Sequence, residues 1–211
     1  GELGKAEEIY RQCVDFCSQN DFTRHAAMAR LGLARVTALQ GDFRRAVAVT
    51  RECLAVLRRE KYQNSIAFAL HDLGEYACEL GDLDSAKESF VEALQLFEKI
   101  GMPGGTAACL RGLAEVAKNT DMNDRAVRLF GTTAAYFDLI EESIVLLAHD
   151  HSGSINSLHE ELGEEFDALW HEGRGMSINQ AVKLALDGGQ RHKILDETQG
   201  MKKLSRSWLQ T

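Results

Sequence analysis

Histidine and cysteine are the side chains of this sequence that could bind a metal or carry out catalysis. Their spacing indicates neither a metal site nor a catalytic site. Five of the seven histidines lie in the C-terminal third, and four of these are close together in the sequence, at His149, His151, His159 and His171. On a helix His149 and His151 would point in different directions, and the sequence contains no His-Glu-x-x-His motif or paired-cysteine knuckle. It contains no Gly-x-Ser-x-Gly nucleophile motif either. We therefore expect no metal ion, no cofactor and no enzymatic activity.

The five cysteines are better explained by packing. Cys13 and Cys17 stand at positions i and i+4, so they share one face of a helix. Cys13 also has an equivalent in Cys53, at the matching place of the next apolar helical pattern. Because an odd number of cysteines argues against a disulfide framework, we expect reduced thiols buried between helices.

The elements that position these residues follow a 40-residue period. Gly41-Asp42 and Gly81-Asp82 are separated by one full period. Small residues recur in the same register at Ala6, Ala46, Ala86 and Ala126, and a second set recurs at Tyr10, Thr50, Phe90 and Phe130. A fixed period of this length is typical of tandem structural repeats.

The register predicts an all-α chain of tandem helical hairpins stacked as a right-handed superhelix. Glycine suits the end of the first helix of a hairpin, and aspartate suits the start of the second. First helices are expected near residues 23–40, 65–80 and 105–120, and second helices near 3–19, 43–60, 83–100 and 122–140. Loops are expected at 20–22, 61–64 and 101–105; the last has three glycines and the only proline, and its alternative interpretation is a hinge.

The C-terminal third departs from the period and is expected to cap the array. A helix over 143–162 is expected to pair with one over 164–172, before a break at 173–175. A capping box from Ser177 to Gln180 then opens a short helix. The side chains expected to cover the last core face are Phe166, Trp170, Val182 and Leu186.

We accordingly divide the chain into three parts. Repeats occupy 1–140, with a partial first repeat at 1–20, so that the chain is expected to begin in mid-repeat. An atypical capping hairpin with a short helix occupies 141–187, and a polar tail or extra helix occupies 188–211.

One stretch of the sequence resembles the tetratricopeptide repeat. It comprises Leu73-Gly74, Gly81-Asp82, Ala86, Phe90 and Ala93-Leu94. The consensus of that repeat has Leu-Gly in its first helix, Gly at the turn, and then Ala, an aromatic residue and Ala in its second helix. The present unit is longer, at about 40 rather than about 34 residues. The resemblance implies that the first helices line a concave binding face.

The resemblance also implies which residues lie on that face. Arg35, Glu75 and Glu115 form one row, His71 and Arg111 belong to another, and Glu79, Lys118 and Asn119 lie one turn further along. Such mixed charges can hydrogen-bond a protein or peptide segment, with an arginine holding a carboxylate through two contacts. The alternative is an ordinary solvated helix face.

A longer series of motifs resembles the C-terminal repeat region of large bacterial signal-transduction ATPases, including LuxR-type transcription regulators. The series includes Cys109-Leu110-Arg111-Gly112, Arg125-Ala126-Val127-Arg128, Leu162-Gly163-Glu164 and Gly173-Arg174-Gly175. The resemblance implies a sensor or protein-interaction arm whose ATPase and output domains lie elsewhere. We find no phosphate-binding loop or helix-turn-helix motif in this sequence. Two other functions stay open: a peptide-pheromone-binding regulator domain and a homo-oligomerisation scaffold.

Charge and composition narrow the class of partner. The sequence has 32 acidic and 24 basic residues, which gives a net charge of -8 and disfavours binding to a phosphate backbone. No apolar run approaches the roughly 20 residues that cross a bilayer, and the first residues lack a signal pattern. We expect a cytoplasmic protein whose partner is a protein, a peptide or another domain of the same polypeptide, and neither nucleic acid nor a membrane.

Overall fold

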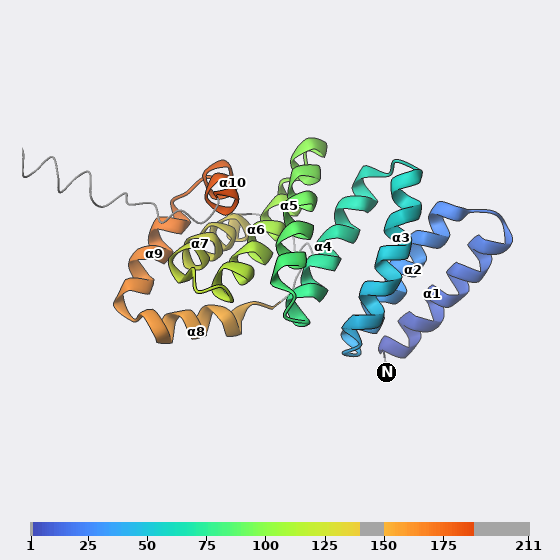
Figure 1. Cartoon of the computed structure of the whole chain (residues 1–211), viewed down its shortest axis with the longest axis horizontal. Helices are drawn as coiled ribbons and strands as arrows, with labels where there is room; N and C mark the ends of the chain where they lie inside the picture. Colours follow the sequence, from blue (N-terminus) through green and yellow to red (C-terminus); the bar gives the residue numbers. More distant parts are fainter. Residues whose placement is uncertain (1, 140–149, 188–211) are drawn as a thin grey trace, which may run out of the picture.

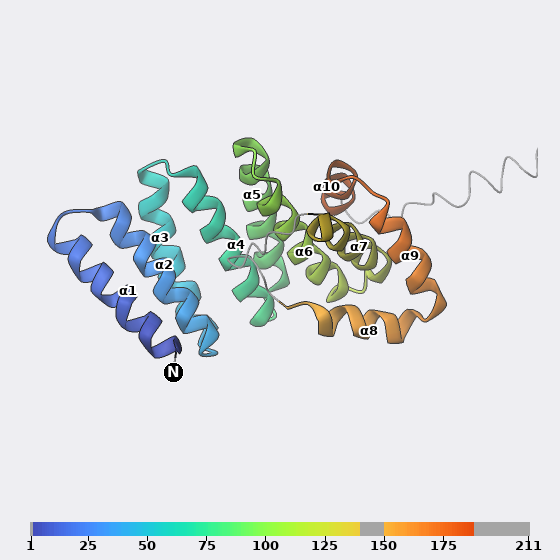
Figure 2. The same ribbon diagram turned by 180° about the vertical axis from the view of Figure 1, so that it is seen from behind.

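The computed structural model describes residues 2–139 and 150–187. This part of the chain forms ten α-helices and no strand (Figure 1, Figure 2), so the all-α prediction of stacked helical hairpins is confirmed. The helices are α1 (Glu2–Gln19), α2 (Thr23–Leu39), α3 (Phe43–Arg59), α4 (Gln63–Glu79), α5 (Leu83–Ile100), α6 (Pro103–Lys118), α7 (Asn123–Leu139), α8 (Ser152–Leu162), α9 (Glu164–Arg174) and α10 (Ile178–Leu186). Three predictions lie outside the described residues: the helix start at 143, any role of His149, and the tail at 188–211.

The same turn joins consecutive helices from α1 to α7. A residue with a left-handed backbone recurs with a 20-residue spacing, at Asp21, Gly41, Lys61, Gly81, Gly101 and Asp121, with φ between 56° and 88°. The N–H of the following residue donates to a carbonyl oxygen of the preceding helix, as from Asp42 to Thr37 at 3.1 Å. This Schellman arrangement satisfies carbonyl groups that a helix end leaves open. Each 40-residue hairpin is therefore made of two half-units that close in the same way.

The predicted aspartate caps are confirmed. Asp42 accepts a hydrogen bond from the N–H of Arg45 at 3.1 Å, and Asp82 accepts one from the N–H of Ser85 at 3.2 Å. Each carboxylate satisfies an N–H at the start of a second helix and lies at the positive end of that helix dipole.

Two of the predicted loops are too long. Helix α4 begins at Gln63, and α6 begins at Pro103 rather than beyond Gly105. Proline suits the first position of a helix because its missing N–H would have no partner there in any case. Gly105 is buried within α6, where an added Cβ would lie 2.4 Å from a ring carbon of Phe97. Its role is to bring α5 and α6 close together, and it is not part of a loop or a hinge.

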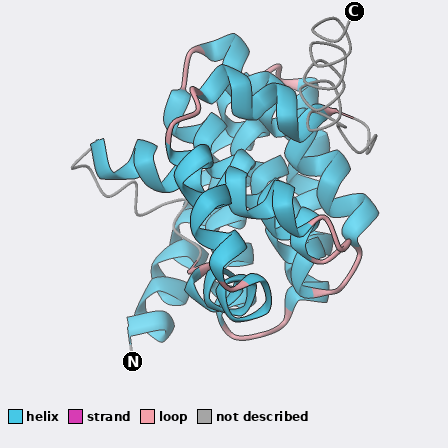
Figure 3. Ribbon diagram, turned by 90° about the vertical axis from the view of Figure 1, so that its left-hand side faces the viewer, coloured by secondary structure: helices cyan, strands magenta, loops and turns pink. Residues whose placement is uncertain are grey.

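Phe90 shows how consecutive hairpins stack. Its ring is fully buried, and it packs against the backbone of α4 on one side and of α6 on the other. A Cβ added to Gly74 or Gly112 would lie 2.6 Å or 2.4 Å from that ring. An end view shows the described part as helices connected by short loops (Figure 3). The main core therefore runs from α2 to α10 as one cluster of side chains contributed by both helices of successive hairpins, and a smaller cluster contains Ala38, Ala46 and Tyr76.

Helix α1 lies at the edge of the array and has no buried residue. The prediction that Cys13 is a packed thiol is wrong, because its side chain is exposed. The equivalent Cys53 is buried in α3, which has α2 on one side and α4 on the other. Among the described helices α1 packs mainly against α2. The face of α1 that carries Cys13 is therefore not covered by a described helix, unlike the face of α3 that carries Cys53.

The C-terminal end is arranged differently from the prediction. Helix α9 packs mainly along α7, and only a few of its contacts are with α8. The two backbones approach closely, since an added Cβ on Gly173 would lie 2.3 Å from the carbonyl oxygen of Arg128. Thr132 Oγ1 donates to the carbonyl oxygen of Gly173 at 2.8 Å. Gly173 is thus a contact point inside α9, and the predicted break at 173–175 is wrong for Gly173 and Arg174, which are both helical.

The predicted capping side chains divide into two groups. Phe166 and Val182 are buried, and Trp170 stacks on Phe166 with ring centroids 5.5 Å apart. Leu186 is 42% exposed and covers little of the core. The predicted capping box is confirmed: Ser177 Oγ accepts from the N–H of Gln180, and the Gln180 side chain accepts from the N–H of Ser177.

The close approach of α7 and α9 can be tested with Gly173→Ala. Alanine would ordinarily stabilise a helix interior by about 0.5–1 kcal/mol relative to glycine. Here the new methyl group would meet the backbone of Arg128, so we expect a loss of about 1–3 kcal/mol in the free energy of unfolding, measured by urea denaturation.

Gly153→Ala in α8 is the matched control, because nothing lies within 4 Å of its added Cβ. If Gly173→Ala is as stable as Gly153→Ala, the close contact between α7 and α9 is refuted.

Candidate functional site

The first helices α2, α4 and α6 carry seven of the eight residues predicted for the concave face, and Asn119 directly follows α6. The structure places most of them in a polar network of three neighbouring groups, one of which contains a residue from α8. Arg35 pairs with Asp72, His71 lies beside Glu75, whose carboxyl also feels the charge of Arg111, and Glu115 is hydrogen-bonded to Ser154 of α8.

An ion pair links α2 to α4. Arg35 Nε donates to Asp72 Oδ2 at 2.8 Å, while Asp72 is only 7% exposed. Burial raises the pKa of Asp72 although the charge of Arg35 acts in the opposite direction. Asp72 was not predicted as a site residue. In the sequence Asp72 is recognisable only by comparison between repeats, because the equivalent residues one period before and after it are Gly32 and Gly112.

Glu75 and His71 are buried, which corrects their prediction as open groove residues. Their exposed fractions are 7% and 3%, and His71 Nε2 lies 3.6 Å from Glu75 Oε1. Burial raises the pKa of Glu75 to about 8, while the positive charge of Arg111 partly opposes the shift. Both side chains lie on α4, the middle first helix, which has neighbouring hairpins on either side.

Glu115 is the point where α8 meets the array. Its carboxylate accepts hydrogen bonds from Ser154 Oγ at 2.8 Å and from Asn119 Nδ2 at 3.0 Å, and His151 Nδ1 lies 3.3 Å away. Burial by itself would raise the pKa of Glu115, but these hydrogen bonds outweigh it and lower the pKa to about 2. Lys118 Nζ also donates to Ser154 Oγ at 3.4 Å. The start of α8 is thus bound to α6 by the same residues that were predicted to bind a partner.

The other predicted residues differ in their accessibility. The guanidinium of Arg111 lies 5.0 Å from the ring centre of Phe137 on α7, a cation–π contact. Burial lowers the pKa of Arg111, and the charge of Glu75 opposes that shift. Glu79 and Asn119 are exposed at the C-terminal ends of α4 and α6, and Arg35 and Lys118 are half-buried. The part of the network that another molecule can reach therefore centres on these last four side chains.

The arrangement suits binding through hydrogen bonds and charges. Among the described residues, no group of three or more His, Cys, Asp and Glu side chains could hold a metal ion. Burial raises the pKa of Cys53 and of Cys109, which disfavours the reactive thiolate form. No helix in the described ranges is both long and apolar enough to span a membrane.

Comparison with known protein families gives one match. The family model described as tetratricopeptide repeat matches residues 65–136, which extend from α4 to α7. This supports the resemblance seen in the sequence over that stretch. No curated protein matches the chain, and no solved structure does so either.

The burial of Glu75 predicts a specific dependence of stability on pH. Its pKa is about 8 in the folded protein against an ordinary value of 4.5. The protonated carboxyl therefore contributes its full stabilisation below the ordinary value, and this contribution is lost as the pH rises through the folded value. We expect Glu75 to lower the free energy of unfolding by about 1.4 kcal/mol per pH unit between roughly pH 5 and pH 8.

Glu75→Gln should remove this contribution, because the amide is neutral at every pH. Urea denaturation at several pH values between these limits measures the difference in slope. Glu79→Gln, one turn along the same helix and exposed, should keep a slope close to that of the wild type, because burial and not the charge of Glu79 is the main cause of the raised pKa of Glu75. Equal slopes for wild type and Glu75→Gln would show that Glu75 does not titrate in this way.

Proposed function

We propose that this chain is a protein- or peptide-binding arm of a larger bacterial signalling or transcriptional regulator that acts in the cytoplasm. Tetratricopeptide repeats generally mediate protein–protein interaction, and the family match covers the central hairpins. No catalytic step forms part of this proposal. The partner is a protein, a peptide segment or another domain of the same polypeptide.

One observation carries the proposal: polar and charged side chains from three consecutive first helices converge on one side of the array. In a solenoid this side forms an extended concave surface for ligands. Glu115 is an example of such binding, because it holds Ser154 of α8 and His151, which directly precedes α8, at a point where neighbouring helices meet. A partner would use the accessible residues Arg35, Glu79, Lys118 and Asn119 in the same manner, through charge-assisted hydrogen bonds.

The regulator context rests on the ordered motifs between Cys109 and Gly175 that resemble bacterial signal-transduction ATPases. It predicts that the complete open reading frame encodes an ATPase or an output domain as well. An open reading frame with neither would contradict it, while the binding role of the array could still hold.

Binding can be tested with peptides selected by phage display against the immobilised chain. Hydrogen exchange should show that the selected peptides protect α2, α4 and α6. The double variant Glu79→Lys/Asn119→Lys should weaken their binding about tenfold or more, which corresponds to about 1.4 kcal/mol. Both positions are exposed, and a lysine at position 119 keeps a hydrogen-bond donor beside Glu115 in place of Asn119, so the circular dichroism spectrum should not change. Reversing the charge of Glu75 or Glu115 instead would disturb buried contacts.

Glu88→Lys is the control, because Glu88 is exposed on the second helix α5. Selected peptides that protect only second helices, or that bind the double variant with wild-type affinity, would refute the concave assignment.

A second candidate function, homo-oligomerisation, is favoured by the surface of α1. Ile9 and Phe16 are 59% and 60% exposed on this helix, and they stand at positions i and i+7 on one face. Clustered apolar side chains of this size often mark an interface.

Size-exclusion chromatography with light scattering tests this alternative. A dimer that dissociates in Phe16→Glu, but not in the control Glu8→Lys at an exposed position of the same helix, would establish oligomerisation through α1. A wild-type chain that is monomeric at high concentration would exclude it.

A further inference from the structure

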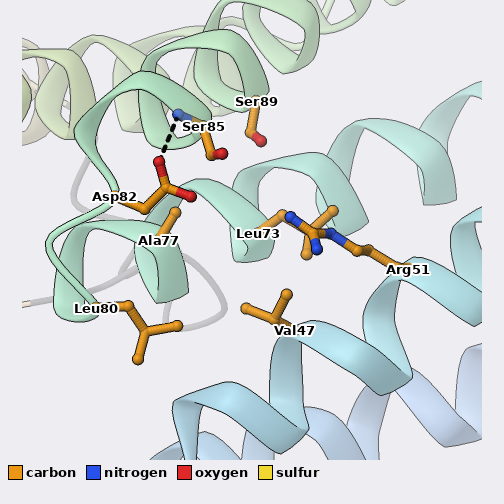
Figure 4. Close-up of a pocket in the computed structure, with 8 residues that line it drawn as sticks. All are labelled: Val47, Arg51, Leu73, Ala77, Leu80, Asp82, Ser85 and Ser89. Carbon is orange, nitrogen blue, oxygen red and sulfur yellow. Dashed lines mark hydrogen bonds between the residues drawn. The ribbon is translucent and has the colours of Figure 1, made fainter.

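A hollow opens on the opposite side of the repeats, between the second helices α3 and α5. Its volume is about 160 Å³. Val47 of α3 and Leu73 and Ala77 of α4 form its apolar floor, and Ser85 and Ser89 of α5 form the facing wall (Figure 4). An apolar cavity of about 150 Å³ is large enough to hold a benzene ring, so this hollow has room for one large apolar side chain.

The 40-residue register explains why the hollow occurs at this place. Ser89 occupies the position that is Val49 in the preceding hairpin and Leu129 in the following one. Leu129 is fully buried, so an aliphatic side chain can fill this position in the same architecture. The small hydroxyl side chain of Ser89 leaves the corresponding space open between α3 and α5.

Arginines flank the hollow on the α3 side only. Arg51 lines it and extends toward Leu73 (Figure 4), and Arg44 lies two turns earlier on the same face as Val47 and Arg51. Both arginines are exposed, and neither makes an ion pair with any described residue. Arg58, two turns beyond Arg51, is by contrast paired with Glu92 of α5 at 2.7 Å.

The opposite wall has the opposite charge. Asp82 lines the hollow from the start of α5, where its carboxylate already accepts a hydrogen bond from the N–H of Ser85 at 3.2 Å. The hydrogen bonds with Ser85, together with the charge of Arg51, hold the pKa of Asp82 below its usual range. An acidic ligand is thus favoured along α3 and disfavoured along the start of α5, which gives the hollow a direction.

We propose that this hollow is a second interaction site, which binds an acidic protein segment through one leucine- or phenylalanine-sized side chain. The apolar side chain fills the space beside Ser89, and the acidic residues of the segment lie along α3 against Arg51 and Arg44. The site is formed mainly by second helices, so it is separate from the network on the first helices and does not depend on the function proposed above.

The proposal can be tested by fluorescence anisotropy with a labelled peptide in which a run of glutamates precedes one phenylalanine. Binding should fall about tenfold or more when the phenylalanine is replaced by alanine, when the glutamates are replaced by lysines, or when the protein carries Arg51→Gln. Arg59→Gln is the matched control, because Arg59 is exposed on the same helix but does not line the hollow.

Ser89→Leu tests the hollow directly, since it introduces the residue that the next hairpin has at Leu129. It should abolish the dependence on phenylalanine without lowering the melting temperature, because it fills an existing space. If the leucine disturbs the fold, Ser89→Val supplies the residue of the preceding hairpin at Val49 and should have the same effect on binding.

Several results would overturn the proposal. They are no binding of the glutamate–phenylalanine peptide to the wild-type protein, equal binding of the alanine peptide, or unchanged binding to both Ser89 variants. Equal competition by a short DNA duplex with no dependence on phenylalanine would indicate a general basic patch and would also overturn it. The variant Glu79→Lys/Asn119→Lys should bind the peptide normally, so failure at one surface is distinguishable from failure at the other.

Discussion

The structure depends on one backbone constraint, a left-handed residue that closes a helix once in each 20-residue half-unit. Six of these residues lie between α1 and α7, and each is followed by the same hydrogen bond back into the preceding helix. The turn stops each helix at nearly the same length and reverses the chain, so that helices pack side by side with antiparallel neighbours. Because the turns are equally spaced, residues one period apart take equivalent places, and the packing pattern of one hairpin is repeated in the next.

The sequence reveals this constraint only in part. Three of the six positions are glycine, the residue with least steric cost in the left-handed region, whereas Asp21, Lys61 and Asp121 adopt it as well. The 40-residue period is visible because Gly41 and Gly81 mark the turn within a hairpin. The 20-residue half-period is hidden in the sequence, because half of the turns have a residue other than glycine at the left-handed position. The helices and their order could therefore be predicted. It could not be predicted that the turn within a hairpin and the turn between hairpins have the same structure.

The candidate site could be predicted less well than the fold, and the reason lies in long-range packing. The register places Arg35, Glu75 and Glu115 on equivalent positions of α2, α4 and α6, but it carries no information about what covers them. Helix α8 lies outside the repeat, and its contact with Glu115 through Ser154 follows from no periodic pattern. The same holds at the C-terminal end, where α9 packs along α7 through Gly173 and Gly131. Departures from the repeat, such as Asp72 and Ser89, are the informative positions, because a regular scaffold makes each of them visible by comparison with its neighbours.

Glu75 and Glu115 show that equivalent positions of the repeat can have very different chemical properties. They are the same residue type one period apart, yet the pKa of Glu75 is raised to about 8 and that of Glu115 is lowered to about 2. Glu75 is buried on the central helix, and burial disfavours its charged form. Glu115 is also partly buried, but donors from Asn119, Ser154 and His151 stabilise its negative charge. The charge that holds α8 on the array is thus stabilised in part by α8 itself, so removing α8 from α6 would remove donors that favour the ionised carboxylate. The protonation of Glu115 and the docking of α8 are therefore coupled, whereas the raised pKa of Glu75 reports on the packing of α4 within the array.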